Sequence, residues 1–94
     1  MSPQTVRYEP APHVTCTALD DSEAVLLNLE TKYFYTLNET GLFVWNRLQT
    51  GEAPEQIAAS LEANYKIDKQ EALDRINRFI ETLRRENLIH EAGD

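Results

Sequence analysis

Few residues of this sequence combine a type and a spacing that could do chemistry. Cys16 follows His13 by three residues, and a thiolate beside an imidazole is a common catalytic nucleophile. However, residues three apart on a β-strand point to opposite faces of the sheet, so these two side chains would not meet. We therefore interpret Cys16 as a small buried thiol and expect no catalytic residue.

Patterns that hold metals or phosphates are also missing from the sequence. The chain has one cysteine, and its two histidines, His13 and His90, lie near opposite ends. Its three glycines are scattered and form no phosphate-binding loop. The acidic pair Asp20–Asp21 is typical of a turn. We predict a protein that is not an enzyme and uses no metal and no cofactor.

Length and charge exclude several further classes of function. A chain of 94 residues forms one domain, and 41% hydrophobic content with 27% charged residues is typical of a folded soluble protein. The net charge of −7 argues against nucleic acid and against an anionic membrane as partners. No apolar run is long enough to span a membrane, and the start lacks the apolar segment of a signal peptide. We expect a cytoplasmic protein that is a monomer when free.

Basic residues gather in the last third of the chain, where a DNA-reading helix would place them. Six of the nine Lys and Arg residues lie from Lys66 onward, but seven acidic residues share this segment. Three acid–base pairs are spaced by four residues, the pattern of a solvent-exposed helix face. These pairs are Glu71–Arg75, Asp74–Arg78 and Glu81–Arg85.

The most unusual stretch is KYFYTLNETGLFVW, residues 32–45, which holds five aromatic residues. Three of them are adjacent, at Tyr33, Phe34 and Tyr35. Alternation from Leu37 places Tyr33 and Tyr35 on the core side, and Phe34 and Thr36 on the other. Proline and charged residues usually prevent an edge strand from pairing with another chain, and this strand has neither after Lys32. Either the strand is an open edge that binds an added peptide strand, or all three aromatics are core and another element covers it.

Around this stretch, the pattern predicts three strands followed by three helices. Residues 1–12 contain three prolines and are expected to form an extended or flexible arm. Alternating runs at residues 13–19, 23–29 and 33–37, joined by short turns, predict an antiparallel meander.

The three expected helices then follow one another. The first begins after the N-cap Asn38 and ends at Thr50–Gly51. The second begins at Pro54 and continues through Tyr65. The third covers residues 68–86, with DKQE resembling a capping box, an apolar stripe along one face and Asn87 in a left-handed cap. The fold class is α+β, in the order β-β-β-α-α-α, close in content to a winged helix-turn-helix. The domain is expected over residues 13–90, with a tail at 91–94.

Residues 26–61, LLNLETKYFYTLNETGLFVWNRLQTGEAPEQIAASL, resemble the PqqD-like family of leader-peptide recognition elements. The resemblance extends over about residues 13–90. Two departures are Lys32 and Asn87, where glycine is common in the family. The matching residues, in order and spacing, are Phe34, Tyr35, Leu37, Asn38, Gly41, Val44, Trp45, Leu48, Gly51, Ile57 and Leu61.

This resemblance implies a winged-helix-like fold that binds the leader segment of a ribosomally made precursor peptide. The leader would add as an antiparallel strand to the third strand, in a groove closed by the third helix, and a separate enzyme would do the chemistry. The hairpin LLNLETKYF is most similar to members that serve lasso-peptide biosynthesis with a leader peptidase and a cyclase. The alternatives are a PqqD-type partner of a radical-SAM enzyme in cofactor biosynthesis, or a small winged-helix DNA-binding protein.

The candidate peptide-binding site combines the third strand with one margin of the third helix. On the strand, backbone groups of residues 33–37 would pair with the leader. On the helix, the margin at Arg75 and Phe79 stays open as the alternative to the one we choose. The candidate residues are Tyr33, Phe34, Tyr35, Thr36 and Leu37 on the strand, and Leu73, Ile76, Asn77 and Ile80 on the helix.

Overall fold

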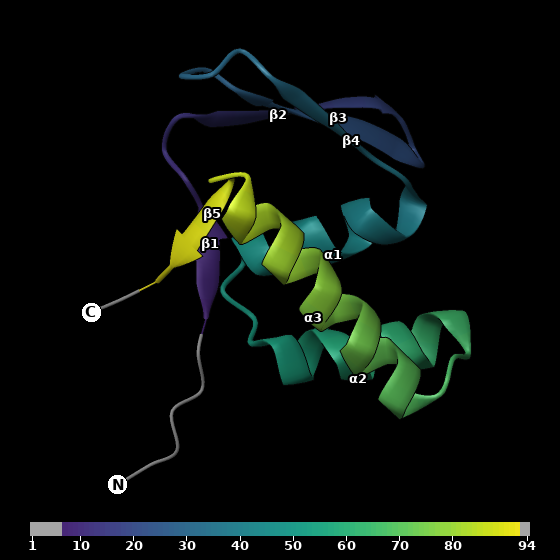
Figure 1. Cartoon of the computed structure of the whole chain (residues 1–94). Coiled ribbons are helices and arrows are strands. Elements are labelled where there is room, and N and C mark those ends of the chain that lie inside the picture. The colour runs from purple at the N-terminus through teal and green to yellow at the C-terminus, as the bar shows by residue number, and fades with distance from the viewer. Residues whose placement is uncertain (1–6, 93–94) are drawn as a thin grey trace, which may run out of the picture.

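A computed structural model describes residues 7–92 of the chain. The helices lie beneath a three-stranded sheet, the first next to the sheet and the second farthest from it, and a second, two-stranded sheet stands at the side (Figure 1). None of the described helices is long and apolar enough to cross a membrane. The elements are β1 (Tyr8–Pro10), β2 (Val14–Asp20), β3 (Glu23–Asn28), β4 (Phe34–Leu37), α1 (Glu39–Gln49), α2 (Pro54–Tyr65), α3 (Lys69–Arg85) and β5 (Ile89–Glu91).

The three-stranded antiparallel sheet is the expected meander, in the order β2-β3-β4. Register pairs Leu26 with Cys16 on one side and with Tyr35 on the other. A sheet of three strands has two edges, and here these are β2 and β4. The α+β class and the three helices are confirmed, so the sequence predicts the main layers correctly.

The second sheet, β1 with β5, was not expected from the sequence. Part of the predicted arm, Tyr8–Pro10, is indeed extended, but it pairs with Ile89–Glu91 rather than standing free. Tyr8 is buried, and Ala11 N–H donates to the carbonyl of Leu88. The element order is therefore β-β-β-β-α-α-α-β. Residues 1–6 of the predicted arm, and 93–94 of the predicted tail, lie outside the described residues.

Helix boundaries follow the local signals with one exception. The side chain of Asn38 accepts a hydrogen bond of 2.8 Å from Gly41 N–H, as an N-cap should. Asn87 takes the predicted left-handed conformation, with φ of 60°. Asp68 is the N-cap of α3, but its side chain makes no capping hydrogen bond, so the predicted capping box is wrong.

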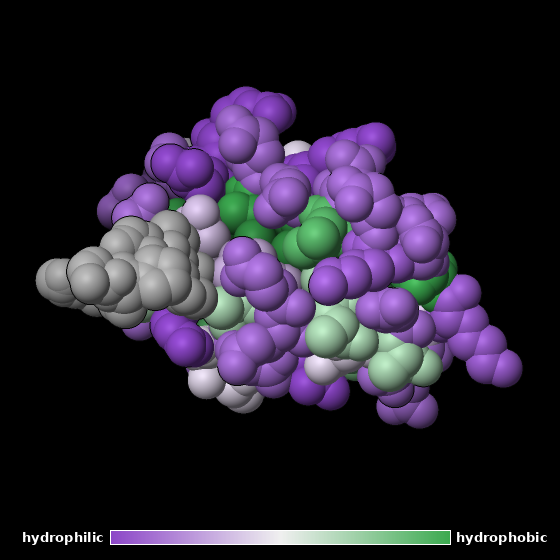
Figure 2. All heavy atoms as spheres, turned by 90° about the horizontal axis from the view of Figure 1, so that it is seen from below, coloured by the Kyte–Doolittle hydropathy of each residue, from purple (hydrophilic) through white to green (hydrophobic). Residues whose placement is uncertain are grey.

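The hydrophobic core lies between the sheet and the helices. Along β3 burial alternates, so Ala24, Leu26 and Asn28 face the helices while Val25 and Leu27 face outward. Trp45, Leu48 and Ile57 are among the residues that fill the core from α1 and α2. The face of the molecule opposite the sheet is mostly hydrophilic, with small separate hydrophobic areas (Figure 2).

Cys16 is exposed, so its interpretation as a buried thiol is wrong. It shares a face with the buried Leu26, but α1 packs against β3 and β4 and leaves that face of β2 accessible. Partial burial still raises the pKa of the Cys16 thiol above its usual value. The strand position alone could not reveal that the helix layer stops short of β2.

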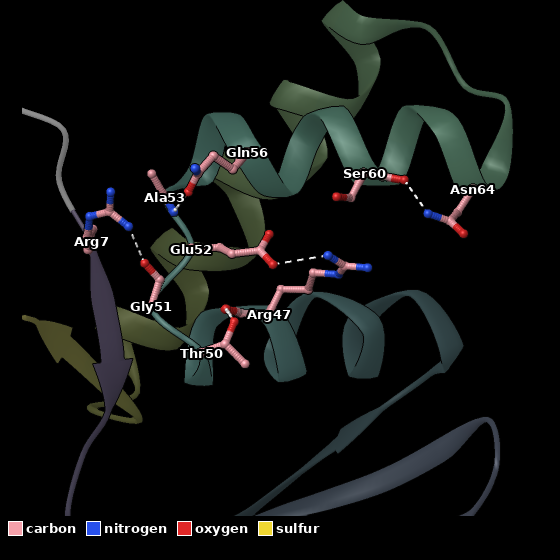
Figure 3. A network of polar contacts seen from close by, with 9 residues as sticks. All are labelled: Arg7, Arg47, Thr50, Gly51, Glu52, Ala53, Gln56, Ser60 and Asn64. Atoms are coloured by element: carbon pink, nitrogen blue, oxygen red, sulfur yellow. Dashed lines mark hydrogen bonds and ion pairs between the residues drawn. The ribbon is translucent and has the colours of Figure 1, made fainter.

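A network of polar contacts connects β1 to the connection between α1 and α2 (Figure 3). The Arg7 guanidinium donates a hydrogen bond to the carbonyl of Gly51, and Arg47 forms an ion pair of 3.0 Å with Glu52. Gln56 accepts a hydrogen bond of 2.9 Å from Ala53 N–H at the start of α2. The Arg7 hydrogen bond holds the start of β1 against this connection, and the other two contacts stabilise the connection itself.

Candidate functional site

The candidate site is the free edge of β4, which pairs with β3 alone in the described chain. Asn28 N–H donates to the carbonyl of Tyr33 at 2.9 Å, so the backbone groups of Tyr33 point toward β3. In an antiparallel pair this orientation alternates along the strand. The backbone groups of Tyr35 and Leu37 therefore also point toward β3, whereas those of Phe34 and Thr36 point outward. The expectation that every residue from 33 to 37 offers its backbone was too broad.

Side chains on β4 divide as alternation predicts. Leu37 is buried and Tyr35 is half-buried on the helix side, whereas Phe34 and Thr36 are exposed. Phe34 keeps 70% of its surface accessible. Tyr33 precedes the strand and is 75% exposed, so it does not join Tyr35 and Leu37 in packing inward.

A hollow of about 380 Å³ lies between β4, α1 and α3. Its apolar lining includes Tyr35, Val44 and Phe79, and Gly41 contributes backbone. A side chain at position 41 would crowd this wall, because its Cβ would lie 3.3 Å from the Asn38 Oδ1. The full lining of this larger hollow is Glu23, Tyr35, Thr36, Leu37, Asn38, Thr40, Gly41, Val44, Leu61, Arg75, Ile76 and Phe79.

A smaller hollow of about 210 Å³ lies at the other end of β4, beside the end of α3. Tyr35 lines both hollows, so they adjoin one another along the strand, and we call the two hollows together the β4 groove. At the end of α3, Arg85 and Glu86 contribute charged side chains to the lining of the smaller hollow. Its full lining is Asn28, Thr31, Tyr33, Phe34, Tyr35, Arg85, Glu86, Asn87 and Leu88.

The margin of α3 that faces β4 differs from the one we chose. Of the four predicted helix residues, Ile76 lines the groove; Leu73, Asn77 and Ile80 line neither hollow. The helix is rotated so that Arg75 and Phe79, one turn apart, face the strand. Ile80 is instead a core residue at 5% exposure. The alternative left open by the sequence is therefore the observed one.

Charge in the groove is mixed rather than strongly positive or negative. Arg75 lines the larger hollow and forms an ion pair of 2.7 Å with Glu71. Glu23 brings a carboxylate from β3 to the same hollow. Because both signs are present, the groove has no strong charge of one sign, and the apolar side chains and the outward backbone groups of β4 are its most distinctive features.

The cysteine and the histidines considered as catalytic residues lie outside the groove. Neither a cysteine nor a histidine lines either hollow. His13 Nε2 lies 3.1 Å from the carbonyl of Asn87, and its Nδ1 lies 3.8 Å from the Glu30 carboxylate, so it is engaged away from Cys16. In the described part of the chain, no three His, Cys, Asp or Glu residues cluster as metal ligands would.

Comparison with known proteins identifies the family. The profile of the family described as "Coenzyme PQQ synthesis protein D (PqqD)" matches residues 23–89, which include β3, β4, all three helices and the start of β5. The chain belongs to the PqqD family. The resemblance found in the sequence is thereby confirmed, and the matched segment contains every residue that lines the β4 groove.

Two solved structures are similar over nearly the whole fold of this PqqD family member. One, "TbiB1 in Complex with the TbiA(beta) Leader Peptide", has a TM-score of 0.83 and 28% identity, and covers 92% of this chain and 99% of its own. The other, "Lasso peptide synthetase B1 complexed with the leader peptide", has a TM-score of 0.83 at 21% identity, covering 89% and 98%, and supports the fold alone. No curated protein matches the sequence.

Proposed function

We propose that this protein binds the leader segment of a ribosomally made precursor peptide and delivers it to processing enzymes of the lasso-peptide type. The single observation that carries the proposal is the free edge of β4 beside a groove with an apolar lining. Similarity to a TbiB1 structure that contains a leader peptide supports this choice of ligand. The site of action proposed is the cytoplasm, where a precursor is synthesised.

Binding would proceed by strand addition. Phe34 and Thr36 each offer one N–H and one C=O, so an antiparallel leader strand gains about four hydrogen bonds from β4. Alternate side chains of that strand would point into the groove. The larger hollow, with Val44 and Phe79 in its lining, suits an apolar anchor. Backbone pairing supplies affinity and the anchor supplies specificity.

The affinity expected of such a site is moderate. A micromolar Kd corresponds to about −8 kcal/mol, and a leader that becomes ordered on binding loses part of its contact energy. Four backbone hydrogen bonds at about 1 kcal/mol each would supply roughly half of that value. Apolar contacts in the larger hollow have to supply the remainder.

Delivery needs a second surface, and the outer face of the sheet is a candidate. Leu29 and Phe34 are exposed, and Val25 and Leu27 are half-buried on this face, which no helix covers in the described structure. Apolar side chains gathered on an open sheet face are typical of a protein–protein contact. We propose that the peptidase or cyclase docks there and does the chemistry. If the partner were instead a radical-SAM enzyme, the leader would occupy the same groove, and only the enzyme docked on the outer face would differ.

Titration distinguishes a leader-binding protein from a DNA-binding one. The probes are a synthetic leader peptide of a lasso-peptide precursor and duplex DNA, each at two salt concentrations. We expect the leader to bind with a weak salt dependence, because apolar and backbone contacts dominate. A DNA-binding protein would instead bind the duplex with a steep loss of affinity as salt rises. Binding of the duplex but not the leader would refute the proposal.

A further inference from the structure

The opposite edge of the sheet, β2, also has free backbone groups. Leu29 N–H donates to the carbonyl of His13 at 2.8 Å, so the backbone of His13 points toward β3. Alternation then points Thr15 and Thr17 toward β3 and leaves Cys16 and Ala18 pointing away from the sheet. Within residues 7–92, the edge thus offers two unpaired N–H groups and two unpaired C=O groups in a short, regular stretch.

This edge lacks most of the protection that strands at a sheet edge usually have. From Val14 to Leu19 there is no charge and no proline, and nearly every residue of β2 is exposed. The irregularity between Ala18 and Asp20 disturbs only the end of the strand. Exposed edges without such features tend to pair with another strand. Cys16 and Ala18 are exposed on the helix side of β2, so no described helix lies beside this edge as α3 lies beside β4. The space next to β2 is therefore wide enough for a whole second copy and is not limited to a single peptide.

We infer that β2 pairs with β2 of a second copy of this chain, antiparallel, about a two-fold axis at Thr17. In this register Cys16 lies opposite Ala18 of the second copy, and each pair exchanges both of its backbone hydrogen bonds. All the outward groups of Cys16 and Ala18 are then satisfied, about four bonds in total. Thr17 faces Thr17 of the second copy, a favourable cross-strand pair.

The lack of charge on this edge makes it a less repulsive place for two copies to meet than a charged surface would be. Two copies that each carry a net charge of −7 repel one another, and residues 14–19 of β2 form an uncharged strip on which they can approach. In the same register the acidic turn at Asp20–Asp21 lies near His13 of the second copy and near the Glu30 carboxylate beside that histidine, so its charge contribution is mixed. The arrangement is isologous, because the same strand supplies both halves of the contact.

Pairing through β2 leaves both β4 grooves accessible, because β4 is the far edge in the order β2-β3-β4. The dimer would therefore present one continuous sheet with a free β4 edge at each end. This differs from the monomer expected from the sequence, and it does not depend on the proposed leader-binding function.

Cysteine cross-linking tests the register directly. In a Cys16→Ser background, Thr17→Cys should form an intermolecular disulfide under mild oxidation, because self-opposed residues of a non-hydrogen-bonded pair have Cα atoms about 4.5 Å apart. Thr15→Cys is the matched control on the same face of the same strand. Residue 15 lies opposite residue 19 of the second copy, so its own counterpart is about 13 Å away and cannot be bridged.

Sedimentation of the full chain over a wide concentration range supplies the second measurement. We expect the wild type to dimerise and Ala18→Pro to remain a monomer, since proline removes an outward donor without removing a bond to β3. Equal cross-linking of Thr17→Cys and Thr15→Cys, or a wild type that stays monomeric at every concentration, would overturn the inference. Leader binding can be measured on the same variants and should be unchanged, which separates the two proposals.

Discussion

Replacing Thr36 with proline is the most direct test of strand addition at β4. The N–H of Thr36 points away from β3, so its loss should leave the sheet intact. In the proposed complex this N–H donates to a carbonyl of the leader. Thr36→Pro should therefore weaken leader binding while the protein stays folded.

The size of the effect follows from what is lost. One backbone hydrogen bond contributes about 0.5–1.5 kcal/mol net, and a buried carbonyl of the leader left without a partner costs about 1–3 kcal/mol. Taking about 1.5–3 kcal/mol for the combined loss, we expect Kd to rise roughly 10- to 150-fold. The melting temperature should change by only a few degrees, because no bond of the β3–β4 ladder is removed.

Two control variants separate backbone effects from side-chain effects. Thr36→Ala keeps the N–H and removes only the exposed side chain, so it should bind nearly as the wild type does. Tyr35→Pro removes an N–H that points toward β3 and leaves the carbonyl of buried Leu26 unpaired, so it should lower stability by about 1–3 kcal/mol. Calorimetric titration and thermal unfolding provide both readouts. If folded Thr36→Pro binds the leader as tightly as Thr36→Ala, strand addition at β4 is wrong.

Four further substitutions, one of them a control, test the groove and the hairpin. Phe79→Ala should weaken leader binding about tenfold or more through lost apolar contact, whereas Asn77→Ala on the opposite margin of α3 should leave Kd unchanged; equal effects in titration would contradict the assigned margin. Lys32→Gly should raise the free energy of unfolding by about 0.5–1 kcal/mol, because Lys32 has φ of 69°, and denaturant unfolding measures this. Asn28→Ala should lower that free energy by about 1–3 kcal/mol, because the buried Oδ1 of Asn28 accepts two backbone N–H groups of the hairpin turn; an unchanged midpoint would contradict this.

Local patterns in the sequence predict most of the fold. Alternation places Leu37 inward and Phe34 outward, and the caps at Asn38 and Asn87 place two helix ends. Local patterns do not predict the β1–β5 sheet, because each of its strands has only three residues and pairs with a strand at the other end of the chain. Strands that short have no measurable period, and Pro10 argues against one.

The site was predictable only in part. Strand order follows from short hairpins, so the free edge of β4 could be predicted. Which margin of α3 faces that edge depends on how the helix is rotated by packing against α2. Both margins adjoin the same apolar stripe, with Leu73 and Ile80 on one side and Phe79 on the other, so the pattern alone cannot choose between them.

Three adjacent aromatic residues now have three different environments. Tyr35 turns its ring toward the helices and lines both hollows, while its backbone holds β4 to β3. Phe34 does the reverse, since its backbone groups point to the free edge and its exposed ring lies on the outer face of the sheet. Tyr33 lies beside the smaller hollow, before the strand begins. These aromatic residues can therefore belong both to the core and to a binding edge. Because orientation alternates along the strand, the ring of Tyr35 and the backbone of Phe34 both face the β4 groove. A peptide strand added to β4 would form hydrogen bonds with the backbone of Phe34 and contact the ring of Tyr35.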